Sequence, residues 1–214
     1  MGRSNGRYIP ALGIRALTPF YDLIQRWIVR DTRFKGRLIE QAGIQAGQRV
    51  LDLGCGTGTL AIMVKRSQPD AEVIGLDADP QMLRVAAAKA AREAPAIKFD
   101  EGMAFSLPYL DGSFDRVLSS LMIHHLKTPD KEGAAREVYR ILKSGGQLHV
   151  IDFGRPRTAY GKMVGLFLHG FEEANDNIDG RLPSIFEQAG LKVREVGDYM
   201  TFFGSLTFLY GEKV

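Results

Sequence analysis

The segment Val50–Gly58 constrains the fold of this chain more than any other, and it reads VLDLGCGTG. An apolar run of strand-forming residues leads directly into three glycines at alternate positions. Glycine lets the backbone turn sharply and come close to a ligand, because it carries no Cβ. The segment therefore predicts a strand followed by a ligand-binding turn and a helix.

The spacing of the glycines limits the class of ligand that this loop can bind. A dinucleotide loop has the pattern Gly-x-Gly-x-x-Gly, whose sixth position is Thr59 here, so that the last glycine comes one place early. This register opposes a nicotinamide-dependent oxidoreductase. It does not by itself identify another ligand, because loops of this composition also occur as plain structural turns.

From residue 49 onward the chain alternates short strand-like runs with helix-like segments, which is typical of a parallel sheet covered by helices. Helices are predicted at 80–93 and 129–142, where Asp79 and Thr128 each place a capping side chain before a proline. Glycines at 145–146 and at 190 are expected to close helices. The predicted strands are 49–54, 71–77, 97–102, 114–120, 146–152, 193–200 and 205–211.

The last two predicted strands are separated only by Thr201 to Gly204. This connection is too short for a helical crossover, so the two strands must pair as an antiparallel hairpin. We therefore predict an α/β fold with a doubly wound, seven-stranded, mostly parallel sheet, helices on both faces and one antiparallel C-terminal hairpin strand. This is not the six-stranded dinucleotide fold.

The length of 214 residues suits one globular unit. Residues 1–37 hold eight Lys and Arg against two Asp, whereas the whole chain has a net charge of +3. We predict cap helices in residues 1–40, chiefly a helix over 18–39 with a solvated basic face, above the ligand edge of one Rossmann-like unit at 41–214. Contact of that basic face with a membrane surface is the alternative.

The composition indicates the cellular compartment and the kinds of partner that we expect. No apolar run approaches the roughly 20 residues that cross a bilayer, and the basic N-terminus lacks the apolar stretch of a secretory signal. The single cysteine, Cys55, can form neither an internal disulfide nor a cysteine-based metal site. We expect a cytoplasmic protein without a metal. A nucleic-acid partner is not expected, because no stripe of interleaved aromatic and basic residues occurs.

The segment Val50–Gly58 matches, without a substitution, the first motif of the class I S-adenosylmethionine-dependent methyltransferases, and the chain resembles their ubiquinone and menaquinone methyltransferase branch. Clear motifs cover residues 21–143, and the likeness continues more loosely to the C-terminus. The resemblance implies S-adenosylmethionine as cofactor, S-adenosylhomocysteine as product and a small, partly apolar molecule as methyl acceptor. Such a transferase needs little catalytic machinery, since a sulfonium already activates its methyl group.

The resemblance also implies which residues hold the cofactor. Asp52 is expected to hold the ammonium group, and Asp77, at the tip of the second strand, to accept hydrogen bonds from both ribose hydroxyls. Asp79 is expected to act mainly as a helix cap. Gly54, Gly56 and Gly58 are expected to line the methionine and ribose side. Further expected contacts are Tyr21, Ala78, Met82, Gly102, Met103, Ala104 and Ser119, of which Met82 has core packing as an even alternative.

One position departs from the family pattern. Residues 101–115 resemble its Gly-Asp-Ala, Leu-Pro-Phe and Ser-Phe-Asp signature, but the Asp that accepts from the adenine amino group is Met103 here. A thioether is too weak an acceptor to replace a carboxylate. We predict that Met103 and Ala104 pack on the adenine ring while its amino group bonds to backbone or water.

His124 and His125 follow the fourth predicted strand, at the sheet edge where ligands of such folds bind. A metal site is disfavoured, because neighbours in an extended segment point opposite ways and no cysteine or acidic partner lies at zinc-like spacing. One histidine is expected to be structural. His124 is the candidate general base, with a packed or hydrogen-bonded role as the alternative. The stretch 154–177 is expected to form the acceptor wall.

Three other functions are compatible with parts of the sequence. Methyl transfer to lipid or nucleic acid is motivated by the basic N-terminal segment. A nicotinamide-binding oxidoreductase is opposed by the glycine register and the terminal hairpin. A protein that binds S-adenosylmethionine without turnover is suggested only by Met103.

Overall fold

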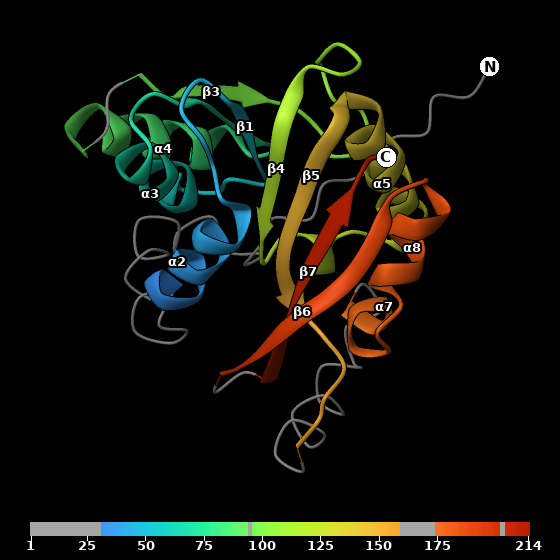
Figure 1. The fold of residues 1–214 in the computed structure, drawn as a ribbon. Helices are drawn as coiled ribbons and strands as arrows, with labels where there is room; N and C mark the ends of the chain where they lie inside the picture. Colours follow the sequence, from blue (N-terminus) through green and yellow to red (C-terminus); the bar gives the residue numbers. More distant parts are fainter. Residues whose placement is uncertain (1–30, 94–95, 159–173, 202–203) are drawn as a thin grey trace.

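The computed structural model describes residues 31–93, 96–158, 174–201 and 204–214. Within them, seven strands form one sheet in the order β3-β2-β1-β4-β5-β7-β6 (Figure 1). Strands β1 to β5 pair in parallel, and β7 runs antiparallel to both β5 and β6. The predicted fold and its hairpin strand are confirmed. The bounds are β1 Arg49–Leu53, β2 Glu72–Asp77, β3 Lys98–Glu101, β4 Phe114–Ser120, β5 Leu142–Phe153, β6 Lys192–Thr201 and β7 Gly204–Glu212.

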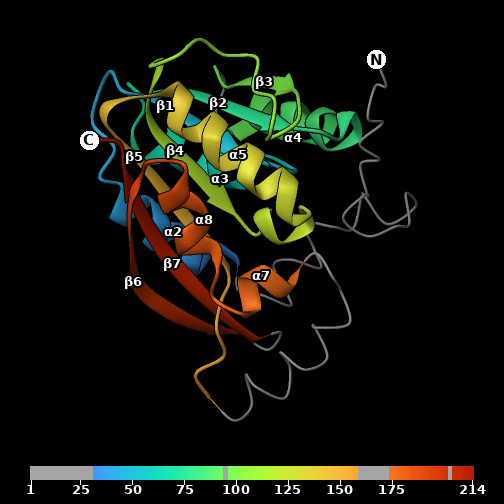
Figure 2. The same ribbon diagram turned by 90° about the vertical axis from the view of Figure 1, so that its right-hand side faces the viewer.

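Helices cover both faces of this sheet. Figure 1 shows α2, α3 and α4 on one side, and Figure 2 shows α5, α7 and α8 on the other. A short 3-10 helix, η2, follows β4. The bounds are α2 Asp31–Ala42, α3 Thr59–Ser67, α4 Pro80–Glu93, η2 Ile123–His125, α5 Thr128–Ile141, α7 Asn175–Ile178 and α8 Leu182–Gln188.

Two apolar clusters sandwich the sheet, because successive strand residues point to opposite faces. On β1, Leu51 packs in the cluster under α5, whereas Val50 packs in the cluster that contains Phe34 and Leu38 of α2. Strands buried on both faces read as continuous apolar runs, as Val50 and Leu51 do. The sheet is therefore a rigid base for the loops at its carboxyl edge.

The start of α4 was predicted correctly, whereas the start of α5 was not. Gln81 N donates to Asp79 Oδ1 at 2.7 Å, which confirms Asp79 as a cap. Lys127 precedes α5 without a side-chain cap, and Thr128 already lies in the helix. The Thr128 hydroxyl donates instead to Asp176 at 2.6 Å. The prediction of a Thr128 cap was wrong because a distant carboxylate binds this hydroxyl.

The end of α5 also differs from the prediction. The helix ends at Ile141 and β5 begins at the next residue. Residues 143–146 form a bulge of β5, since Leu142 pairs with Phe114 while Gln147 pairs with Arg116. Gly145 N donates to Lys213 O at 2.7 Å, and Lys213 N to Gly146 O at 3.0 Å. The glycines thus shape a bulge against the C-terminal strand and do not close the helix.

The helix predicted over 18–39 is described only from Asp31 onward. It extends beyond the predicted end to Ala42, which is buried against the sheet. Arg33 and Arg37 of α2 are exposed. Residue 40, where we predicted the cap segment to end, lies inside this helix, and the domain division and membrane contact stay predictions.

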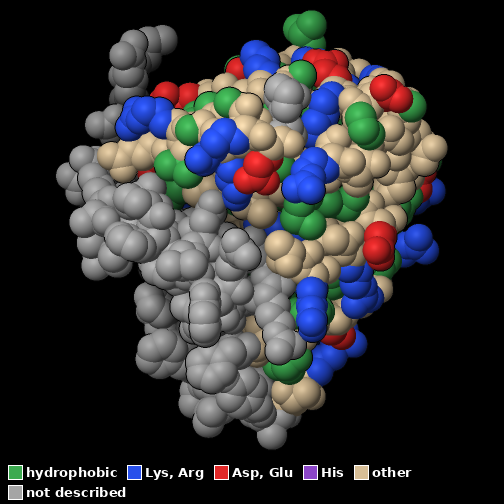
Figure 3. All heavy atoms as spheres, turned by 90° about the vertical axis from the view of Figure 1, so that its left-hand side faces the viewer, with side chains coloured by type: hydrophobic (Ala, Val, Ile, Leu, Met, Phe, Trp, Pro, Cys, Tyr) green, Lys and Arg blue, Asp and Glu red, His purple; other side chains and the backbone are tan. Residues whose placement is uncertain are grey.

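Figure 3 views the side of the molecule that carries α2, α3 and α4. Lys and Arg side chains are scattered over its described part, with Asp and Glu between them. None of the helices in the described ranges combines the length and the apolar character that a membrane span requires.

Candidate cofactor and acceptor site

The glycine loop after β1 has a backbone that other residues rarely adopt. Gly54, Gly56 and Gly58 have φ values of 72°, 53° and 74°. Gly54 N and Cys55 N both donate to Leu76 O, at 2.8 and 2.9 Å. The loop is therefore fixed against the end of β2, and its shape depends on glycine.

The three glycines serve different purposes. A Cβ on Gly54 would overlap the side chain of Met122, and one on Gly58 would lie 2.9 Å from Ala86. A Cβ on Gly56 would meet nothing within 4 Å. Gly54 and Gly58 thus allow close packing inside the protein, whereas Gly56 alone borders open space that a ligand can fill. Their common role in cofactor binding stays a prediction.

Asp77 connects three segments at this edge. Its Oδ2 accepts from Gly56 N at 2.8 Å and its Oδ1 from Asp79 N at 2.9 Å, while Asp77 O accepts from Gly102 N at 3.0 Å. Burial raises the pKa of the Asp77 carboxyl. Each carboxylate oxygen has a second lone pair, so the group can also accept from hydroxyls of a ligand. The open space at Gly56 and this carboxylate fit the predicted ribose.

Asp52 and Ser119 lie behind the loop. Asp52 is 2% exposed, and its Oδ2 accepts from Ala61 N at 2.9 Å in the first turn of α3. A carboxylate there stabilises the helix N-terminus. The Ser119 hydroxyl donates to Leu53 O at 3.0 Å. The structure thus gives both residues a role in supporting the loop, and their cofactor contacts stay predictions.

The residues predicted to hold the adenine follow β3. Ser106 N donates to Met103 O at 3.0 Å and closes a turn, and Ala104 is buried beneath it. Met82 is buried in α4, and Ala78 is partly exposed beside Asp77. Tyr21 lies outside the described residues. The backbone bond between Gly102 and Asp77 places this turn beside the glycine loop.

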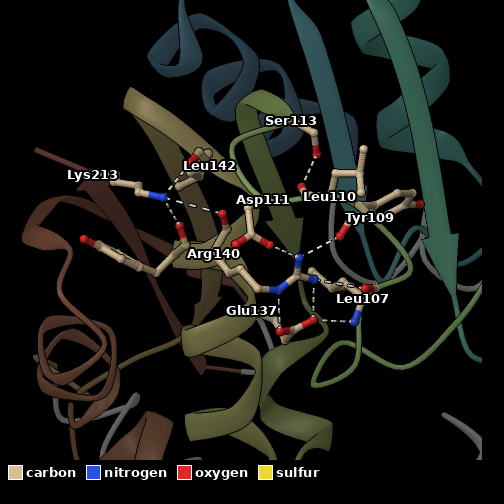
Figure 4. A network of polar contacts seen from close by, with 10 residues as sticks. Leu107, Tyr109, Leu110, Asp111, Ser113, Glu137, Arg140, Leu142 and Lys213 are labelled. Atoms are coloured by element: carbon tan, nitrogen blue, oxygen red, sulfur yellow. Dashed lines mark hydrogen bonds and ion pairs between the residues drawn. The ribbon is translucent and has the colours of Figure 1, made fainter.

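Arg140 of α5 clamps the loop that continues from this turn (Figure 4). Its guanidinium donates to Tyr109 O and Asp111 Oδ1, both at 2.7 Å, and to Leu107 O at 3.1 Å. Two more bonds of 2.8 Å reach the Glu137 carboxylate, which accepts from Leu107 N at 2.7 Å. These bonds to Arg140 hold the pKa of Glu137 below its usual range. The far side of the predicted adenine loop is thus fixed to a helix.

Lys213, also drawn in Figure 4, binds the same end of α5 in another way. Its ammonium donates to Tyr139 O and Leu142 O, both at 2.8 Å. A cation there satisfies carbonyls that the end of a helix leaves unpaired. The two cations therefore have different roles. Lys213 binds the carbonyls at the end of α5, whereas Arg140 binds the carbonyls of the adjoining loop.

A His–Asp pair lies at the ends of β4 and β5. His124 Nδ1 is 2.7 Å from Asp152 Oδ1, and the His124 side chain is 15% exposed. Asp152 also accepts from the backbone N–H groups of Ile123 at 2.8 Å and Phe153 at 2.7 Å. Burial alone would raise the pKa of Asp152, but the His124 contact and these hydrogen bonds hold it below its usual value. The carboxylate is therefore charged and orients the imidazole.

One expectation about the histidines was wrong. The rings of His124 and His125 do not point opposite ways, since their centroids are 4.0 Å apart. The segment is a 3-10 helix and not an extended one, so neighbouring side chains diverge less. The acidic partner of His124, Asp152, is 28 residues away in the sequence, which is not the zinc-like spacing that the prediction considered. In the described ranges no three His, Cys, Asp or Glu side chains gather as a metal site requires.

Leu121 joins the two halves of the site. It has a φ of 54°, although leucine strongly disfavours positive φ, and its N–H donates to Ile151 O at 2.9 Å. This bend turns the chain from β4 into η2 and places Met122 directly over Gly54. The residue that precedes η2 therefore packs against the glycine loop, and His124 follows it two positions later. No local sequence pattern indicates that Met122 takes this position.

The predicted acceptor wall is described only in part. Of the predicted stretch 154–177, residues 159–173 lie outside the described ranges, whereas 154–158 and 174–177 lie within them. The sequence can indicate that Asp152 has a polar partner, because a carboxylate at the end of a buried apolar strand is costly without one. The sequence cannot identify that partner as His124, since the pairing depends on how β4 and β5 align.

Residues 50–146 match the family described as Methyltransferase domain. The chain is 39% identical over 148 residues to a demethylmenaquinone methyltransferase of Thermus thermophilus, covering 68% of this chain and 66% of that protein. It is 34% identical over 145 residues to the enzyme of that name from Deinococcus radiodurans, covering 67% and 59%. An uncharacterized methyltransferase of Synechocystis is 32% identical over 166 residues, covering 76% of each chain.

Solved structures share the fold at low identity. A phosphoethanolamine N-methyltransferase of Haemonchus contortus in complex with S-adenosyl-L-methionine aligns with a TM-score of 0.75 at 16% identity, covering 95% of this chain and 58% of that one. A SAM-dependent methyltransferase from Aquifex aeolicus gives a TM-score of 0.68 at 17% identity, covering 93% and 97%.

Proposed function

This chain belongs to the class I S-adenosylmethionine-dependent methyltransferases of the menaquinone-like branch, and from that premise we propose that it methylates a small, partly apolar acceptor of the reduced-quinone type. The cofactor, S-adenosylmethionine, follows from the family and leaves S-adenosylhomocysteine. The acceptor is supported by the two demethylmenaquinone methyltransferases among the relatives. The single observation that carries it is the His124–Asp152 pair, in the segment whose Met122 packs against Gly54 of the glycine loop.

The cofactor supplies a methyl group that its positive sulfur has already activated. The chain's own residues hold it in the open space at Gly56, with the Asp77 carboxylate as acceptor for the ribose hydroxyls. Met122 packs over Gly54 and thereby connects this site to η2. The protein's main task is then to align an acceptor with the methyl group and to exclude water.

The His–Asp pair provides for acceptors that must lose a proton. When the imidazole is neutral, the charged Asp152 favours the proton on Nδ1, so that Nε2 carries the free lone pair. Nε2 can take the proton of an acceptor hydroxyl, and Asp152 stabilises the imidazolium that forms. A quinol needs this step, because its anion is the better nucleophile. An amine acceptor that is already neutral does not need it.

The test is a panel of acceptors with release of S-adenosylhomocysteine as the measurement. It contains reduced demethylmenaquinone, simple phenols, thiols, amines, phospholipid headgroups and tRNA, together with a titration of S-adenosylmethionine and NADH by calorimetry. We expect S-adenosylmethionine to bind and reduced demethylmenaquinone or another phenolic compound to be methylated fastest. Turnover of phospholipid or tRNA alone would refute the proposed acceptor, and binding without any turnover would identify a non-catalytic protein.

A further inference from the structure

The helix α7 is fixed at the acceptor side of the site. Figure 1 shows it at the end of the sheet toward which β4 and β5 point, and it contacts both η2 and β5. The Asp176 carboxylate accepts from the Thr128 hydroxyl at 2.6 Å and from Arg181 Nη1 at 2.9 Å, and it lies 3.3 Å from Lys131 Nζ. Lys131 and Asp176 are both buried. A charged pair inside the protein thus holds α7 in one place.

Asn177 follows Asp176 and differs from it in a decisive way. The residue is 1% exposed, yet neither its Oδ1 nor its Nδ2 has a hydrogen-bond partner. A buried carboxamide without partners destabilises a fold, whereas a leucine of similar size would stabilise it. Buried polar groups in proteins are almost always paired, so an orphaned one demands an explanation.

The surroundings of Asn177 indicate which explanation applies. The helix that carries it contacts η2, the element of His124, and β5, the strand that ends in Asp152. Of the buried side chains without a partner in the described part, Ser120 lies at the end of β4, also at this edge of the sheet. Ser205, at the start of β7, lies at the same edge, since its O accepts from Gly154 N at 3.0 Å. The unpaired buried polar groups of the described residues thus lie on elements at the edge of the sheet where we propose that the acceptor binds.

We infer that the Asn177 carboxamide is a recognition residue for the acceptor, binding a hydroxyl or carbonyl oxygen of a phenolic or quinol ring. This inference rests on the proposed function. A carboxamide both donates and accepts, so it suits an oxygen that changes from hydroxyl to anion as its proton leaves. A ring with two oxygens can offer one to Asn177 and the other to His124. Asp176 and its partners position Asn177 without touching the acceptor.

The first experiment replaces the amide by a group of the same shape in Asn177→Leu. We expect the KM for the best phenolic acceptor of the panel to rise about tenfold, which corresponds to one lost hydrogen bond. The kcat and the Kd for S-adenosylmethionine are expected to stay within about twofold. An unchanged KM, or an equal loss in the Kd for S-adenosylmethionine, would overturn the inference and leave Asn177 as the site of a buried water or a cofactor contact.

The second measurement is thermal unfolding of the same variant, which does not depend on knowing the acceptor. Removing an unpaired buried amide is expected to raise the Tm by about 2–4 °C. A lower Tm would show that the amide already has a structural partner, and it would overturn the inference. Higher stability together with poorer acceptor binding is the combination that a purely structural residue does not produce.

Ser205→Ala serves as the matched control. Its hydroxyl is likewise buried without a partner, on β7 at the same edge of the sheet, where Ser205 O accepts from Gly154 N at 3.0 Å, but the proposal gives this hydroxyl no contact with the acceptor. We expect its Tm to rise slightly and its KM to stay unchanged, whereas a KM change equal to that of Asn177→Leu would overturn the inference. If the wild type methylates no phenolic compound, the proposed function fails. The inference about Asn177 is contradicted by different results, namely a lower Tm or an unchanged KM of Asn177→Leu.

Discussion

Two parts of the sheet edge are built differently. The ends of β1, β2 and β3 form the part that we propose binds the cofactor, here called the cofactor edge. The ends of β4 and β5, with η2 and α7, form the part that we propose binds the acceptor, here called the acceptor edge. At the cofactor edge Gly56, Asp77 and Gly102 bind one another through short hydrogen bonds, and Arg140 fixes the adjoining loop. At the acceptor edge Leu121 is strained, and Ser120 and Asn177 have unpaired polar groups.

This difference has a physical meaning. A loop whose own hydrogen bonds are complete keeps its shape before the ligand arrives, and that reduces the entropic cost of binding. Unpaired groups in a buried place do the opposite, because they are satisfied only when a partner enters. The hydrogen bonds of the protein itself therefore preorganise the cofactor edge, whereas we propose that the bound acceptor completes the acceptor edge. Four predictions test this contrast.

The largest effect is expected from His124→Ala. Loss of a general base typically slows proton transfer by about 10²–10⁴-fold, so the single-turnover rate at saturating phenolic acceptor should fall within that range. The Kd for S-adenosylmethionine should not change. His125→Ala is the control, since no bond to Asp152 is found for this neighbour. An unchanged rate in His124→Ala would exclude the base and make the acceptor edge a binding surface only.

The next effect concerns the open space at Gly56. In Gly56→Ala the new methyl group occupies the space that we propose the cofactor fills. We expect the Kd for S-adenosylmethionine to rise about 100-fold or more, equivalent to about 2.7 kcal/mol. The left-handed backbone costs alanine about 1 kcal/mol in stability. Gly43→Ala has a similar φ, 52° against 53°, and equally open space, but it lies at the end of α2.

Gly43→Ala should therefore lose the same stability in denaturant unfolding while its calorimetric Kd stays that of the wild type. Equal cofactor affinity in the two variants would show that the space at Gly56 is not the cofactor site.

The clamp at Arg140 is expected to have a moderate effect. Arg140→Gln removes its bonds to Leu107 and Tyr109, which lets the predicted adenine loop move, and we expect the Kd for S-adenosylmethionine to rise about tenfold. Lys213→Met removes the other cation at the end of α5. It should lower the Tm and leave this Kd unchanged, as measured by calorimetry and thermal unfolding. If both variants lose affinity for S-adenosylmethionine equally, the position of α5 preorganises the loop, and the hydrogen bonds of Arg140 do not.

The smallest effect concerns stability against pH at His149, in the middle of β5. Burial, followed by the charge of Arg116, lowers the pKa of His149 to about 3. An unfolded histidine has a pKa of about 6.5. Between these values the unfolded chain binds one more proton, so stability is complete above pH 6.5 and falls as the pH drops toward 3.

The loss between pH 6.5 and 5 should be about 2 kcal/mol for this group. Urea unfolding at both pH values should show a loss that is smaller by about this amount in His149→Gln than in the wild type. The loss that stays in the variant is expected from His125, because burial lowers the pKa of that imidazole to about 3 as well. A loss of the same size in the variant would assign the acid sensitivity to other groups, among them those of the acceptor edge.

Local signals account for most of what sequence reasoning predicted. The helix cap at Asp79 depends on a residue two positions away, and the hairpin of β6 and β7 follows from a short connection. The Thr128 cap failed because the hydroxyl binds Asp176, 48 residues further on. The helix end at Gly145 failed because the glycine meets Lys213 of the last strand. Predictions held where the relevant partner is a near neighbour in the chain.

By itself, the sequence determined the class of the fold, the position of the glycine loop and the carboxylate at the tip of β2, because strand periodicity and glycine conformation act over a few residues. The tertiary structure decided the pairing of His124 with Asp152, the clamp from Arg140 to Leu107 and the isolation of the Asn177 amide. Each of these depends on which strands and helices pack together. A hydrogen bond between distant residues is set by that packing, and no local pattern records it.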